Sequence, residues 1–178
     1  MVTESTSHVI RLEETDEEFS RAVIKAFGKN LYYCFQCGTC TASCPVARFD
    51  ENYSPRRIIR SAVLGLSRLV LESDLIWLCA ICNSCTERCP RGVRPSEVIR
   101  TIRNMATKKG QVHEFYVNQA NAIANYGRIW KNEEIVNELR DDMGLPQVAP
   151  VSLVEIAKVM DATKVKELLA ARDGATEK

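Results

Sequence analysis

The chain has 178 residues, of which 46% are apolar, and its formal net charge at pH 7 is +1. This composition is typical of a globular protein rather than a disordered one, and the near-neutral charge gives no support to nucleic-acid binding. No apolar run approaches the roughly 18 residues that a membrane-spanning helix needs. The N-terminal stretch MVTESTSHVIRLEETDEE lacks the basic start and apolar segment of a secretory signal, so we expect a cytoplasmic protein without a membrane span.

The first predicted element is a helix that ends at Gly28. Thr15 and Glu18 have the spacing of a capping box. Apolar residues then follow at helical intervals: Phe19, Val23, Ala26 and Phe27. We therefore expect residues 1–29 to form an N-terminal helical segment.

Two cysteine runs follow, CFQCGTCTASCP from Cys34 to Pro45 and CAICNSCTERCP from Cys79 to Pro90. All eight cysteines of the chain lie in these runs. The second run repeats the first at a constant offset of 45 residues, so that Cys34, Cys37, Cys40 and Cys44 correspond to Cys79, Cys82, Cys85 and Cys89. The duplication extends beyond the cysteines, since Pro55 and Arg60 recur as Pro95 and Arg100 at an offset of 40.

Each cysteine run leads through a proline turn into a predicted helix. Ser54 and Pro55 are a typical N-cap and first helical residue. Pro95 opens the second helix, and Gly110 ends it. Apolar residues at helical spacing mark both helices: Ile58, Ile59, Ala62, Val63 and Leu66 in the first, and Val98, Ile99, Ile102 and Met105 in the second. The repeated unit is therefore a cysteine loop, a proline turn and a helix, and we expect two such units to pack about a pseudo-twofold axis.

The C-terminal part also reads as helical. We expect helices that begin after Gly110 and span Phe115 to Ala124, Glu133 to Arg140 and Thr163 to Ala171, with a linker at residues 144–150. No convincing two-residue alternation indicates strands. The predicted fold class is all-α.

Three chemistries compete for the cysteines. Disulfides are disfavoured by the lack of an export signal and by the very small loops that they would close. Two zinc sites are possible in principle, but a zinc ribbon supplies two cysteines per knuckle rather than four in one run. The spacing C-x2-C-x2-C-x3-C-P is typical of proteins with two [4Fe–4S] clusters, in which the fourth cysteine ligates the other cluster.

The iron–sulfur interpretation predicts crossed ligation. Cluster 1 would be held by Cys34, Cys37, Cys40 and Cys89. Cluster 2 would be held by Cys79, Cys82, Cys85 and Cys44. The crossing brings the two [4Fe–4S] clusters close together, and neighbouring redox centres form a path for electrons. We place this helical ferredoxin-like domain at residues 30–110, between the N-terminal segment and a C-terminal helical extension at 111–178.

Other motifs are absent from the chain. It has no GxGxxG or GxxxxGK[ST] sequence and no Cys-Cys pair. Arginines gather near the cysteines, either as a solvated surface or as compensation for the negative clusters: Arg56, Arg57, Arg60, Arg88, Arg91, Arg94, Arg100 and Arg103. We expect an electron carrier with no catalytic residues of its own.

Both cysteine runs, and above all CGTCTASCPVARFDENYSPRRIIR, resemble the small iron–sulfur subunit, designated C, of the heterodisulfide reductase of methanogenic archaea. The specific motifs cover about residues 30–110. The resemblance implies two partners in the heterodisulfide reductase, one subunit with a flavin and another with CCG motifs, where the CoM-S-S-CoB heterodisulfide would be reduced. A hydrogenase or formate dehydrogenase could feed such an assembly. The alternatives are an equivalent iron–sulfur subunit of another heterodisulfide-reductase-like complex and, from a different class, a structural zinc-binding module.

Overall fold

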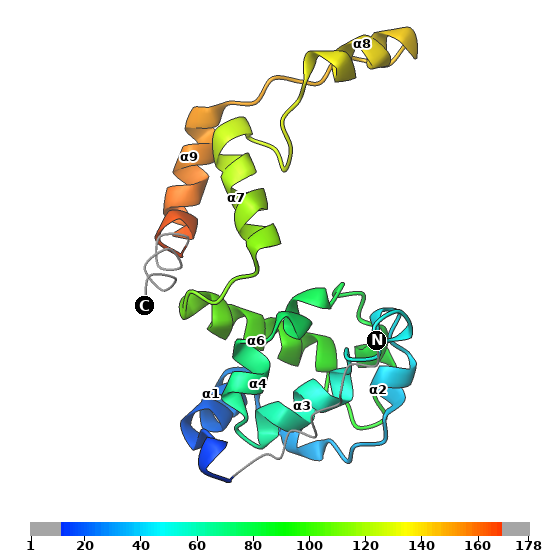
Figure 1. Ribbon diagram of the computed structural model, residues 1–178, viewed down its shortest axis with the longest axis vertical. Coiled ribbons are helices and arrows are strands. Elements are labelled where there is room, and N and C mark those ends of the chain that lie inside the picture. Colours follow the sequence, from blue (N-terminus) through cyan, green and yellow to red (C-terminus); the bar gives the residue numbers. More distant parts are fainter. Residues whose placement is uncertain (1–11, 169–178) are drawn as a thin grey trace, which may run out of the picture. The chain divides into compact units, whose positions relative to one another are not determined.

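The computed structural model describes residues 12–168, in which helices alternate with loops and no strand occurs (Figure 1). This confirms the all-α prediction. The chain divides into two compact units, Met1–Ala106 and Thr107–Lys178. Both cysteine runs lie in the first unit.

The N-terminal helix α1 spans Glu17–Phe27 and ends at Gly28, as predicted. Its cap was predicted one residue too early. The N-cap is Asp16, whose carboxylate accepts a hydrogen bond from the backbone N–H of Phe19 at 2.8 Å. Aspartate is the stronger capping residue, and its negative charge also complements the positive end of the helix dipole, so it displaces Thr15 from this role.

The two helices that follow the cysteine runs are confirmed. Helix α3 spans Pro55–Val63, and the Ser54 hydroxyl caps it by accepting from the N–H of Arg57. Helix α6 spans Pro95–Lys108. The first unit also contains three short α-helices, α2 (Thr39–Ala42), α4 (Ser67–Leu71) and α5 (Ser84–Glu87). Its short 3-10 helices are Leu12–Glu14, Lys29–Tyr33, Val46–Arg48 and Asp74–Leu78.

The sequence repeat is also a structural repeat. In the first copy, the Thr41 hydroxyl accepts a hydrogen bond from the N–H of Arg56, at the start of α3. In the second copy, the Thr86 hydroxyl accepts one from the N–H of Ser96, at the start of α6. A threonine in each cysteine run therefore ties the run to the following helix. Helices α2 and α5 contact each other, which brings the two runs side by side.

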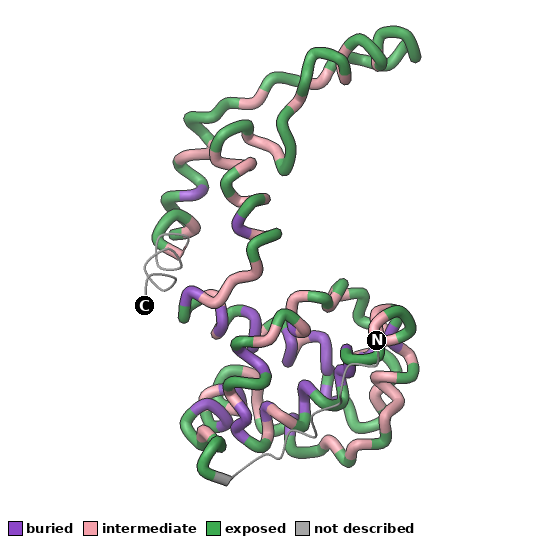
Figure 2. The backbone as a smooth tube through the Cα atoms, in the orientation of Figure 1, coloured by how far each residue is buried: buried purple, intermediate pink, exposed green. Residues whose placement is uncertain are grey.

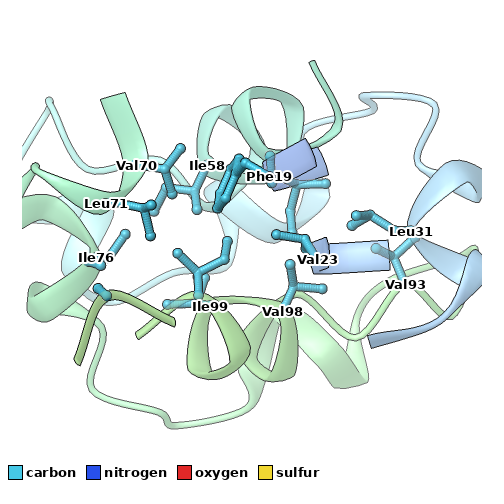
Figure 3. Packing of buried hydrophobic residues seen from close by; sticks show 14 of the residues in the cluster. Phe19, Val23, Leu31, Ile58, Val70, Leu71, Ile76, Val93, Val98 and Ile99 are labelled. Atoms are coloured by element: carbon cyan, nitrogen blue, oxygen red, sulfur yellow. The ribbon is translucent and has the colours of Figure 1, made fainter. Parts of the chain in front are cut away.

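A single apolar core supports both cysteine runs. Phe19 and Val23 of α1, Ile58 of α3 and Val98 and Ile99 of α6 meet there (Figure 3). Burial in the first unit is concentrated along these inward-facing stretches (Figure 2). Hydrophobic burial of this kind fixes the helices and therefore the loops that carry the thiols.

The second unit contains α7 (Glu114–Tyr126), α8 (Glu134–Asp142) and α9 (Leu153–Ala162). Helix α7 packs on α9, with Val117 and Met160 buried. Helices α7 and α8 agree with the predictions for these regions.

Helix α9 was not predicted, although the sequence contains a signal for it. Ser152 caps the helix by accepting from the N–H of Glu155, and serine followed three residues later by glutamate is a capping-box pattern. The helix predicted from Thr163 begins too early, because Thr163 ends α9 and Lys164 has a positive φ of 58°. Residues 165–168 are helical, and residues 169–171 of that prediction lie outside the described residues.

Candidate iron–sulfur centres

Four thiols from the two cysteine runs line one cavity. Cys34, Cys37 and Cys40 come from the first run, and Cys89 comes from the end of the second. Cys34 follows the 3-10 helix Lys29–Tyr33, while Cys40 lies on α2. We call these four residues the first cysteine site. Soft thiolate ligands of this kind suit an iron–sulfur cluster.

The remaining thiols also lie near one another, in what we call the second cysteine site: Cys79, Cys82, Cys85 and Cys44. Cys44 and Cys85 are buried. Burial raises the pKa of Cys85 to about 11, and the negative charges of the neighbouring thiols add to the effect, those of Cys79, Cys40, Cys44 and Cys82. Because Cys40 belongs to the first site, Cys40 and Cys85 mark where the two sites adjoin. The structure thus places four of the predicted ligands around one cavity and the other three thiols close enough to affect the buried Cys85.

One thiol of each site is exposed to solvent, Cys37 in the first and Cys82 in the second. The Cys37 sulfur lies 3.3 Å from the Thr39 hydroxyl, and the Cys82 sulfur lies 3.5 Å from the Ser84 hydroxyl. These hydroxyl contacts lower the pKa of both thiols. They favour the thiolate form, which is the form that binds iron.

Polar hydrogens also reach sulfur in the first site. The Gln36 side-chain amide donates to the Cys34 sulfur at 3.2 Å. The backbone N–H of Val93 donates to the Cys89 sulfur at 3.3 Å. Hydrogen bonds to ligand sulfurs are among the factors that set the potential of an iron–sulfur cluster.

The loops that carry the thiols contain left-handed backbone at matching positions. Gln36 and its counterpart Ile81 have φ values of 63° and 52°. Gly38 and its counterpart Asn83 have φ values of 83° and 64°. Non-glycine residues adopt this conformation at a cost, and such strain concentrates at functional sites. The two cysteine runs therefore share the same turns at matching positions.

Two functional candidates near the second site were not singled out from the sequence. Arg103 was grouped with the other arginines, but it is 8% exposed and donates to the backbone oxygens of Ile76, Trp77 and Cys79. Tyr53 is buried, and its burial together with the neighbouring thiols, Cys79 foremost, raises its pKa. Both placements depend on tertiary packing, and the sequence contains no signal that distinguishes them.

Comparisons with known proteins decide among the chemistries. Residues 30–93 match the family described as the 4Fe-4S dicluster domain. The chain is 37% identical to a CoB–CoM heterodisulfide reductase iron-sulfur subunit of Methanocaldococcus jannaschii over 177 residues, which cover 91% of this chain and 94% of that protein. The chain belongs to the family of heterodisulfide reductase iron–sulfur subunits designated C.

Further members show the same extent of similarity. The corresponding subunit of the H2:CoB–CoM heterodisulfide, ferredoxin reductase of Methanothermobacter thermautotrophicus is 36% identical over 91% of this chain and 90% of its own length. A protein of Archaeoglobus profundus, named only as being like this heterodisulfide reductase subunit, is 32% identical over 91% of this chain and 89% of its own. The family resemblance seen in the cysteine runs is therefore confirmed over most of the chain.

Membership of the dicluster family identifies the cofactors as two [4Fe–4S] clusters. The zinc interpretation is therefore wrong, and so is the disulfide interpretation, since none of the eight cysteines forms a disulfide. Each cluster, when bound, takes up and releases one electron at a time. Within residues 12–168, none of the helices has the length and apolar character needed to cross a bilayer.

Proposed function

We propose that this chain carries electrons within a cytoplasmic heterodisulfide reductase complex. Electrons would enter from a flavin-containing subunit of the reductase and leave to a catalytic subunit with CCG motifs, which reduces the CoM-S-S-CoB heterodisulfide in methanogenesis. A hydrogenase or formate dehydrogenase is the candidate donor to the assembly. Support comes from the relatives, whose names include CoB–CoM heterodisulfide, H2, formate and ferredoxin.

The proposed ligands follow the crossed scheme. Cys34, Cys37, Cys40 and Cys89 hold cluster 1, and Cys79, Cys82, Cys85 and Cys44 hold cluster 2. Support for the first set is the cavity that these four side chains line together. Support for the second set is the electrostatic effect of Cys79, Cys44 and Cys82 on the buried Cys85, to which Cys40 of the first set also contributes. In each set three thiols come from one run and the fourth comes from the other.

One observation carries the proposal of electron transfer through the chain. Each cysteine site has an exposed thiol, Cys37 or Cys82, while the sites adjoin inside the protein near Cys40 and Cys85. A donor that docks at one exposed thiol can therefore deliver an electron that leaves at the other. The interior residues hold the clusters, exclude water from their inner sides and need not bind a substrate.

The second unit favours assembly into a complex. Large apolar side chains are exposed there, including Trp130 at 61%, Met143 at 70% and Val154 at 67%. Exposed apolar side chains can bury their surface against a partner, and contiguous ones mark interaction sites. We propose that the C-terminal extension at 111–178 binds a partner in the complex, in addition to the two-cluster domain at 30–110 and the N-terminal segment at 1–29.

A second candidate function is the same electron transfer in another heterodisulfide-reductase-like complex. The Archaeoglobus profundus relative, whose name states only a likeness to the reductase subunit, favours keeping this alternative. The two functions share the clusters and differ in the catalytic subunit that receives the electrons.

An anaerobic turnover assay tests the proposal. The complete chain with both clusters should be reduced by a low-potential dye, yet show no turnover with the CoM-S-S-CoB heterodisulfide alone. Adding the flavin-containing and CCG-containing subunits should restore turnover, whereas the same two subunits without the chain should show little. Turnover by the isolated chain would mean that it has its own active site. Turnover at full rate without the chain would exclude it from the electron path.

A further inference from the structure

Tyr53 has a buried hydroxyl that no described residue satisfies. The residue is 1% exposed, and its hydroxyl oxygen makes no hydrogen bond of normal distance and angle with a described residue, although the Cys79 thiol is near enough to affect its pKa. Native proteins rarely leave a buried hydroxyl in this state, because it loses its bonds to water without replacement. An acceptor that binds beside it would remove this penalty.

The groups around this hydroxyl identify the acceptor. Tyr53 and Cys44 lie in the same buried cluster, and Cys79 packs against it. Among the thiols, Cys79 has the largest effect on the Tyr53 pKa, followed by Cys44 and Cys85. All three belong to the second cysteine site. A neutral thiol is a weak acceptor, whereas a thiolate bound to iron carries negative charge and accepts a much stronger hydrogen bond.

The first cysteine site has no such hydroxyl at the matching position. The repeat that pairs Pro55 with Pro95 pairs Tyr53 with Val93. Val93 is equally buried and lines the cavity of the first site, where only its backbone N–H reaches a sulfur, that of Cys89. At this pair of matching positions, the second site therefore has a buried O–H donor and the first site has none.

We propose that the Tyr53 hydroxyl donates a hydrogen bond to the Cys79 sulfur when the second cluster is bound, and that this bond raises the reduction potential of that cluster alone. The proposal rests on the proposed ligation of the second cluster by Cys79 and its companions. When the cluster gains an electron, its sulfurs become more negative and the bond strengthens, while the proton stays on the tyrosine. Reduction of the second cluster is thereby favoured.

The test is a potentiometric titration of Tyr53→Phe, followed by electron paramagnetic resonance. The full-length protein with both clusters is used, and the second-cluster signal is defined as the one that Cys82→Ser alters. Removing the hydrogen bond should make reduction of the second cluster about tenfold less favourable, which is about 59 mV for a one-electron couple. The first cluster should keep its potential. Tyr126→Phe, which removes the hydroxyl of an exposed tyrosine, is the matched control and should change neither reduction potential.

A second measurement reports the bond itself. Exchange into D2O should shift the iron–sulfur stretching bands of the second cluster in the wild-type protein but not in Tyr53→Phe. Intact clusters with unchanged second-cluster potential in Tyr53→Phe would overturn the hydrogen bond and leave the proposed function standing. An equal decrease in the reduction potentials of both clusters in Tyr53→Phe would also overturn the proposed hydrogen bond. Wild-type protein without two reducible clusters would instead refute the proposed function.

Discussion

Replacing Arg103 by methionine removes a buried cation that holds the start of the second cysteine run. The guanidinium donates to the backbone oxygens of Ile76 at 2.7 Å, Trp77 at 2.8 Å and Cys79 at 2.6 Å. It also lies over the Trp77 ring, 5.5 Å from its centroid. Methionine has a similar length and fills the space, but it donates no hydrogen bond, so three backbone oxygens lose their donor.

The expected loss of stability follows from these contacts. Hydrogen bonds to charged groups contribute about 1.5–3 kcal/mol each. Only the hydrogen bond to Ile76 is fully buried, so water can partly replace the lost donor at the other two oxygens. We expect Arg103→Met to lower the free energy of unfolding by about 3 kcal/mol. The free energy of unfolding of Arg103→Lys should lie between those of the wild-type protein and Arg103→Met, because one ammonium group cannot span three separate oxygens.

The assay is anaerobic thermal unfolding of the protein with both clusters, followed by circular dichroism at one scan rate. A loss of about 3 kcal/mol should lower the midpoint by about 12 °C in a unit of roughly 100 residues. Arg100→Met is the matched control, since Arg100 lies on the same helix but is exposed, and its loss should cost under about 0.5 kcal/mol. Equal midpoints for the two variants would refute the structural role of Arg103.

Two further predictions concern the backbone and the thiols. Gly65→Ala should cost about 3 kcal/mol in chemical unfolding, because Gly65 has a φ of 74° and a Cβ there would lie 2.5 Å from the backbone oxygen of Asp16. Gly92→Ala, with a φ of 61° but open space, should cost about 1 kcal/mol, and equal costs would contradict the steric argument. In cluster-free protein at pH 8, iodoacetamide should modify Cys37 well before Cys85. The pKa of Cys37 is lowered by a threonine hydroxyl, whereas that of the buried Cys85 is raised to about 11. The difference in modification rate between Cys37 and Cys85 should narrow above pH 11. Equal modification rates at pH 8, measured by mass spectrometry, would show that the thiols of the cluster-free protein do not keep these environments.

The helices that follow the cysteine runs were predictable because local and tertiary preferences agree there. Ser54 and Pro55 fix the start of α3, and the apolar residues at its helical spacing are the ones that the core buries. In α9 the local and tertiary preferences disagree. Val154 and Val159 are exposed, so the apolar pattern does not mark one buried face. The capping pattern at Ser152 alone is too weak a signal to predict the helix.

The cysteine spacing predicts which thiols share a cluster, but it contains no information on how the surroundings differ between the two sites. Tyr53 and Val93 occupy matching positions in the repeat, and only the folded core shows that both are buried beside thiols. Arg103 reaches backbone oxygens 24 to 27 residues earlier in the chain. Contacts over this separation depend on how helices pack and are not encoded in any local pattern.

Crossed ligation of two clusters is the central claim, and a comparison of four serine variants tests it most directly. Mössbauer and electron paramagnetic resonance spectra of Cys37→Ser, Cys44→Ser, Cys82→Ser and Cys89→Ser would be recorded on the otherwise intact protein. The crossed scheme predicts that Cys44→Ser perturbs the same cluster as Cys82→Ser, and that Cys89→Ser perturbs the same cluster as Cys37→Ser. Perturbation of one cluster by Cys37→Ser and Cys44→Ser, and of the other by Cys82→Ser and Cys89→Ser, would contradict it.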